Sequence, residues 1–189
     1  MKRFSALWEN VFKHESDDKT LLTILGRIPV FSNLSKSELR LIEKIVYQRN
    51  YHEKEIIFVE GEPGAGMYII ESGKVRICLG PHTDEEHEIA LLENGDFFGE
   101  LALIDDHPRS ATAVALMPTR LVGFFRSDLL SFISRTPRMG VKIEQNMLQI
   151  LVRRLRITDQ KLNDCFEQLR KIEEQDEQKK EVKEEQVSS

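Results

Sequence analysis

Apolar residues recur along this chain in three different rhythms, which divide it into three parts. Before about residue 47 they fall at spacings of three and four, which is typical of amphipathic helices. Between about 47 and 126 they form short runs separated by turn residues, as strands do. From Pro137 onward they return every seven residues, and neither glycine nor proline follows Gly140. We therefore expect helices, then a small sheet structure, then one long helix.

Apolar stripes and a cap indicate helices in the first part. The stripes consist of Phe4, Leu7, Trp8, Val11 and Phe12, and of Leu21, Leu22, Leu25 and Ile28. Residues 35–38 (SKSE) form a capping box, and Leu34 and Leu39 are placed as its hydrophobic staple. We expect N-terminal helices over residues 1–28 and another helix from the capping box to about Val46.

The middle part has the composition of an antiparallel sheet structure. Eight of the ten glycines fall between Gly61 and Gly123, where they punctuate the apolar runs. The predicted strands are 56–59, 67–70, 75–79, 89–92, 111–116 and 121–125. Regular short strands without intervening helices predict a β-roll or jelly roll over residues 29–136, in an α+β protein.

The third part begins at Thr136-Pro137, an N-cap followed by proline in the first helical turn. Two seven-residue series lie three positions apart: Val141, Leu148, Leu155, Leu162 and Leu169, and Glu144, Leu151, Thr158, Cys165 and Ile172. Such a heptad repeat predicts a coiled-coil seam, so residues 137–172 should form a dimerisation helix that joins two copies of the chain. Residues 173–189 are highly charged and are expected to fray or stay disordered.

Composition and charge exclude several classes of protein. The 189 residues carry a net charge of −5, and residues 31–137 alone carry −6, so no basic nucleic-acid footprint stands out. Two cysteines are too few for a disulfide framework or a structural zinc site, and we predict no metal site. No apolar stretch reaches the length of a membrane span, and no signal peptide is recognisable, so we expect a cytoplasmic protein.

Residues 97–116 (FFGELALIDDHPRSATAVAL) carry the candidate chemistry. Gly99 precedes a run with strong helix propensity, and a helical turn that starts after a glycine presents backbone N–H groups to an anion. Arg109, held in a compact loop by Pro108, is placed to form a bidentate pair with a phosphate. Glu100 beside such a site needs hydrogen-bond donors, and a sugar hydroxyl is an obvious one.

This segment resembles the phosphate-binding cassette of cyclic-nucleotide-binding domains, the family of the bacterial catabolite activator protein and of the regulatory subunits of cyclic AMP-dependent protein kinase. The similarity covers about residues 28–160 and is strongest at FGELAL (98–103), PR (108–109) and AT (111–112). It implies a ligand site that consists of Phe98, Gly99, Glu100, Leu101, Ala102, Arg109, Ser110 and Ala111.

The resemblance also implies a role for each group. Glu100 would bind the ribose 2′-hydroxyl and Arg109 the cyclic phosphate, while backbone N–H groups of residues 99–101, Ser110 and Ala111 complete the cradle. Two alternatives stay open. In one, FGELAL is merely a corner of the barrel and Arg109 a solvated charge; in the other, the cassette is intact but has changed its ligand.

The long helix carries a second resemblance, to the dimer helix of the bacterial activator. There, a threonine at the position of Thr158 meets the adenine amino group, and the next residue is a serine that reaches across from the partner subunit; Asp159 stands at that position here. Both residues are therefore candidate base contacts. Thr158 is equally explained as a tolerated seam residue that sets the register of the coiled coil.

Together these features predict a dimeric cyclic-nucleotide receptor that signals through its long helix to a partner protein. Thr158 favours cyclic AMP as the ligand, and Ser110 keeps cyclic GMP as an alternative. No catalytic constellation emerges, so we expect no enzyme. Only 29 residues follow Gln160, without the apolar pattern of a DNA-binding module, so direct DNA binding is not expected. The alternative from another class is a coiled-coil scaffold whose barrel binds a protein or a different ligand.

Overall fold

The structure is a computed structural model that describes residues 20–80 and 87–187. The predicted stripe from Phe4 to Phe12 lies outside the described residues. The chain divides into two compact units, Met1–Ile150 and Leu151–Ser189, and each is described by itself.

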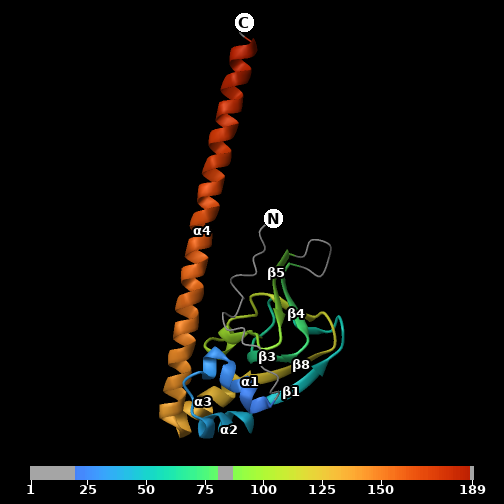
Figure 1. The fold of residues 1–189 in the computed structure, drawn as a ribbon, viewed down its shortest axis with the longest axis vertical. Helices are drawn as coiled ribbons and strands as arrows, with labels where there is room; N and C mark the ends of the chain where they lie inside the picture. Colours follow the sequence, from blue (N-terminus) through green and yellow to red (C-terminus); the bar gives the residue numbers. More distant parts are fainter. Residues whose placement is uncertain (1–19, 81–86, 188–189) are drawn as a thin grey trace. The chain divides into compact units, whose positions relative to one another are not determined.

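The first unit contains two four-stranded antiparallel sheets and the helices α1 to α3 (Figure 1). The helical elements are α1 (Leu21–Arg27), the 3₁₀ turn η2 (Pro29–Phe31), α2 (Lys36–Glu43), the 3₁₀ turn η3 (Glu100–Leu103), α3 (Arg126–Arg135) and α4 (Pro137–Val187). The strands are β1 (Tyr47–Tyr51), β2 (Ile56–Phe58), β3 (Gly66–Ser72), β4 (Lys74–Leu79), β5 (His87–Glu93), β6 (Phe97–Phe98), β7 (Thr112–Ala115) and β8 (Thr119–Phe125).

The order of the strands confirms the predicted β-roll. One sheet has the order β1-β8-β3-β6 and the other β2-β7-β4-β5, so neighbours in space come from distant parts of the chain. All six predicted strands are present within a few residues of their predicted bounds. Two strands were not predicted. β1 has largely polar residues, and β6 is only two residues long.

Apolar side chains form two cores, one on each face of the β1-β8-β3-β6 sheet. Along β3, Tyr68 and Ile70 point between the two sheets, whereas Met67 and Ile69 point towards the helices. This alternation follows from the two-residue period of a strand. Because both faces of β3 are covered, its sequence is apolar almost throughout.

The short helices follow the predicted local signals in part. The capping box is confirmed: Ser35 Oγ accepts from the Glu38 N–H at 3.3 Å, and Glu38 Oε2 accepts from the Ser35 N–H at 2.7 Å. The helix ends at Glu43 and not near Val46, because β-branched residues there lead into the extended β1. Helix α3 was not predicted, since its short apolar run has no Ser, Thr, Asn or Asp as N-cap.

The base of α4 belongs to the first unit. Met139, Ile143 and Met147 are buried in the helix-side core, at a four-residue spacing that places them on one face of the helix. Asn146, also buried, accepts a hydrogen bond from Asn33 at 2.9 Å. The first compact unit therefore includes the base of α4, up to Ile150.

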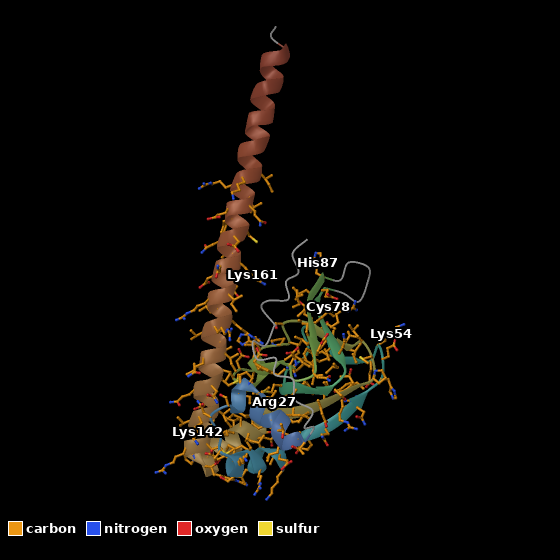
Figure 2. All side chains as sticks on the ribbon, viewed as in Figure 1. Arg27, Lys54, Cys78, His87, Lys142 and Lys161 are labelled. Atoms are coloured by element: carbon orange, nitrogen blue, oxygen red, sulfur yellow. The ribbon has the colours of Figure 1, made fainter. Side chains whose placement is uncertain are left out.

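Two polar contacts fasten the base of α4 to the preceding elements. Asn146 Nδ2 donates to the carbonyl oxygen of Val30 in η2 at 3.0 Å. Lys142, labelled in Figure 2, donates to both carboxylate oxygens of Glu38 at 2.8 and 2.9 Å. The hydrogen bonds from Lys142 and from the Ser35 N–H lower the pKa of Glu38. The first turns of α4 are thus held by η2 and by the N-terminus of α2.

The second unit is the remainder of α4. Large apolar side chains are exposed along it in the single chain: Val152, Leu155, Leu162, Phe166, Leu169 and Ile172. The helix continues to Val187, whereas fraying was expected after Ile172, and the Glu-, Lys- and Gln-rich sequence has high helix propensity. None of the described helices is both long and apolar enough to cross a membrane.

Candidate functional site

Gly99 turns the chain sharply between β6 and η3. Its φ of +73° lies in the left-handed region, which a residue with a side chain adopts only at a cost. A Cβ atom placed there would lie 2.7 Å from Nη1 of Arg109 and 3.3 Å from the carbonyl oxygen of Gly66. The sequence thus has glycine at a point where both backbone conformation and space require it.

The backbone of Arg109 is held by the turn that follows β2. The Arg109 N–H donates to the carbonyl oxygen of Glu62 at 2.8 Å, and the Gly61 N–H donates to the carbonyl oxygen of Arg109 at 2.8 Å. A Cβ on Gly64 would lie 2.7 Å from the Cβ of Ala102 and 3.4 Å from the guanidinium carbon. The cassette loop is therefore packed tightly against this glycine-rich turn.

The side chain of Arg109 lies inside the domain. It is only 8% exposed, and its Nη1 donates to the carbonyl oxygen of Gly99 at 3.1 Å. Burial lowers the pKa of the guanidinium, and Tyr68, Glu100 and Glu62 act in the opposite direction. Since arginine keeps its charge at any physiological pH, the site holds a largely desolvated cation.

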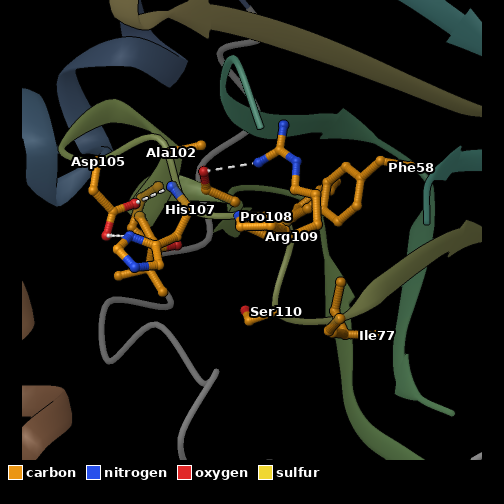
Figure 3. A pocket seen from close by; sticks show the side chains of 13 residues that line it. Phe58, Ile77, Ala102, Asp105, His107, Pro108, Arg109 and Ser110 are labelled. Atoms are coloured by element: carbon orange, nitrogen blue, oxygen red, sulfur yellow. Dashed lines mark hydrogen bonds and ion pairs between the residues drawn. The ribbon is translucent and has the colours of Figure 1, made fainter. Parts of the chain in front are cut away.

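All eight residues predicted for the cassette line a single cavity, shown in Figure 3. Glu100 is fully buried there, and Leu101 and Ser110 are exposed. A buried cation, a buried carboxylate and the start of a helical turn meet in this cavity. Because the first N–H groups of a helical turn have no acceptor within the turn, the cavity combines donors for an anion with an acceptor for a hydroxyl group.

Five further residues line the cavity: Pro108, which was expected only to hold the loop of Arg109, and Phe58, Ile77, Asp105 and His107, which had no predicted role. Asp105 and His107 lie in the same loop as Arg109, where the His107 Nδ1 is 3.2 Å from a carboxylate oxygen of Asp105. Phe58 and Ile77 come from β2 and β4, which the pairing of β7 with both strands brings beside the cassette. Phe58 and Ile77 are recognised as lining residues only from this long-range pairing, because nothing near them in the sequence places them at the cavity.

The two candidate base contacts lie in the second unit. Thr158 and Asp159 are exposed on α4, and Thr158 Oγ1 donates to the carbonyl oxygen of Arg154 one turn earlier, at 3.0 Å. This bond is a common one for a threonine within a helix. A contact of either residue with a nucleotide base stays a prediction.

A two-sheet β-roll with an arginine buried beside a left-handed glycine has the arrangement expected of a domain that binds a small anionic ligand. Comparison with known proteins identifies the family. The sequence profile of the cyclic nucleotide-binding domain matches residues 48–136. This chain therefore contains a domain of the cyclic nucleotide-binding family, in agreement with the resemblance noted in its sequence.

The similar proteins include receptors and regulators. The cyclic AMP receptor protein of Thermus thermophilus is 37% identical over 135 residues, which cover 71% of this chain and 61% of that protein. A CRP-like cAMP-activated global transcriptional regulator of Mycobacterium tuberculosis is 33% identical over 143 residues, covering 76% of this chain and 62% of that protein. The chain thus spans about three fifths of the length of these relatives.

A solved structure supports the fold, and the alignment covers a larger share of that structure than of the two relatives above. The cyclic nucleotide-binding domain from Methylobacillus flagellatus is 29% identical, has a TM-score of 0.63, and aligns over 72% of this chain and 76% of its own.

Substitution of Gly99 by alanine tests the geometry of the cradle. Gly95 is a matched control, because its φ is +85° but its Cβ would meet nothing within 4 Å. Both Gly99→Ala and Gly95→Ala should lower the free energy of unfolding by about 1–2 kcal/mol, the cost of a left-handed alanine. Only Gly99→Ala should also displace the Arg109 side chain, which would appear as a shift of its Nε–H resonance in ¹H–¹⁵N NMR spectra. Equal shifts in the two variants would contradict this geometry.

Proposed function

We propose that the chain is a cyclic-nucleotide receptor that binds cyclic AMP in the cassette cavity and signals through its long helix, as a homodimer, to a partner protein. One observation carries the proposal: Arg109 is buried in the cavity that Gly99 and Glu100 also line. A buried guanidinium gains most from an anion that satisfies its donors, and a cyclic phosphate is such an anion.

In this proposal each group of the cavity has one task. Arg109 pairs with the exocyclic oxygens of the cyclic phosphate, and the N–H groups of residues 99–101, Ser110 and Ala111 donate to the same oxygens. Glu100 accepts a hydrogen bond from the ribose 2′-hydroxyl. A fully buried carboxylate requires hydrogen-bond donors, and the ribose supplies one more of them.

We favour cyclic AMP over cyclic GMP as the proposed ligand for two reasons. The two relatives described above are named for cyclic AMP. Thr158 and Asp159 supply oxygen acceptors on α4 for the adenine amino group. Ser110 next to the cassette arginine is compatible with either nucleotide, so cyclic GMP is the competing ligand to be measured.

The homodimer is proposed from the exposed apolar residues of α4. Leu155, Leu162 and Leu169 are seven residues apart and each is more than half exposed in the single chain. A seam of this spacing is buried when a second helix supercoils against it. Because α4 is continuous from the helix-side core into this seam, a change at its base can alter the geometry of a dimer, and ligand binding would then shift the population of two states.

Loss of the cassette arginine tests the receptor proposal. Arg109→Ala should weaken cyclic AMP binding about 100-fold or more, because it leaves the phosphate without its buried cation. Arg135→Ala, which removes an exposed arginine of α3, is the matched control and should bind as the wild type does. Equilibrium dialysis with labelled cyclic AMP, competed by cyclic GMP, measures all three proteins. Failure of the wild type to bind either nucleotide below millimolar concentration would favour a scaffold instead.

The dimer has a separate test. Replacement of both Leu155 and Leu162 by glutamate places charges on the seam and should convert a dimer into a monomer at micromolar concentration. Gln160→Glu adds a charge at a position outside the seam and should leave the dimer intact. Sedimentation velocity distinguishes the two states. A monomeric wild-type protein at that concentration would disprove the proposed dimer without affecting the ligand proposal.

A further inference from the structure

Aromatic rings of the β-roll lie directly against the cassette arginine. The guanidinium carbon of Arg109 is 4.1 Å from the ring centroid of Phe58 in β2 and 5.9 Å from that of Tyr68 in β3. Figure 3 shows the Phe58 ring beside the arginine side chain. Both distances are within the range at which a cation is attracted to the face of an aromatic ring.

Hydrogen bonds alone leave much of the guanidinium unfixed. Nη1 donates to the Gly99 carbonyl oxygen, while Nε is buried without a hydrogen-bond acceptor among residues 20–80 and 87–172, whose side chains are described. One bond to a backbone oxygen still allows the planar group to rotate about that contact. The ring face of Phe58 supplies the second restraint, because the guanidinium carbon lies over it, 4.1 Å from the ring centroid.

The ring that contacts Arg109 is itself held in place. Phe58, Tyr68 and Phe98 form an aromatic cluster with centroid separations of 5.6 to 6.0 Å for every pair. The three residues come from β2, β3 and β6, so the cluster joins the two sheets. Phe98 is fully buried and immediately precedes Gly99. The aromatic cluster therefore connects the packing between the sheets to the position of the arginine.

We propose that Phe58 is a positioning residue for phosphate recognition: its ring holds the Arg109 guanidinium in the orientation that meets the anion. This inference deepens the proposed function and rests on it. A cation that is already oriented loses less conformational entropy when the ligand binds, so the aromatic contact raises affinity. Within residues 20–80 and 87–172 the Nε of Arg109 has no hydrogen-bond acceptor, so this donor stays available to the anion.

Leucine and tyrosine substitutions at Phe58 test the proposal. Phe58→Leu keeps an apolar side chain but removes the ring, and should weaken cyclic AMP binding by about 2- to 30-fold, the range that a cation–π contact contributes. Phe58→Tyr retains the ring face and should bind within about twofold of the wild type. Phe31→Leu is the control, because Phe31 is a buried aromatic residue of the other core and should leave the affinity unchanged.

A second readout separates positioning from direct contact with the nucleotide, since Phe58 also lines the cavity. In the ligand-free protein, the ring current of Phe58 should shift the Arg109 Nε–H proton, and Phe58→Leu should remove that shift while Phe58→Tyr preserves it. A loss of affinity in Phe58→Leu without a change in this resonance would overturn the proposal. If the wild type binds no cyclic nucleotide, the proposed function fails, and the resonance still decides separately whether Phe58 orients the arginine.

Discussion

The hydrogen bond from Arg109 to the carbonyl oxygen of Gly99 joins the two halves of the cassette, and the site depends on it. It brings a cation into the interior at a place where the chain has just turned through a left-handed residue. Any side chain on Gly99 would occupy the space of the Arg109 side chain, so the buried position of the arginine requires glycine at residue 99. Burial removes water from the cation, and the free energy lost in that step is recovered most completely when an anion binds.

The rest of the fold keeps this contact in place. The turn at residues 61–64 holds the Arg109 backbone by two hydrogen bonds, and the aromatic cluster contacts the guanidinium. On the other face of the same sheet, the helix-side core contains Phe97 together with Met139, Ile143 and Met147 of α4. Phe97 and Phe98 are adjacent in β6 but belong to different cores. A movement of the cassette that shifts Phe98 would therefore also shift Phe97, which packs in the core that contains the base of α4. This arrangement supports the proposal that ligand binding is coupled to the long helix.

Local features of the site could be predicted from the sequence, and long-range ones could not. Gly99 and Arg109 lie within eleven residues, and their types alone indicate an anion site, beside which Glu100 indicates an acceptor for a hydroxyl group. The capping box before α2 was equally local. Phe58 gave no such signal, because its contact with Arg109 depends on which strands pair across the roll. The seven-residue repeat of α4 did not reveal a second apolar face at the start of the helix. Its residues Met139, Ile143 and Met147 pack in the helix-side core and do not belong to the predicted seam.

The crystal structure of the complex with cyclic AMP tests the account most directly. We expect a phosphate oxygen within hydrogen-bonding distance of the Arg109 guanidinium. The ribose 2′-hydroxyl should donate a hydrogen bond to Glu100, and the ring face of Phe58 should still contact the arginine. A nucleotide bound outside the cavity, or one whose phosphate lies away from Arg109, would contradict it.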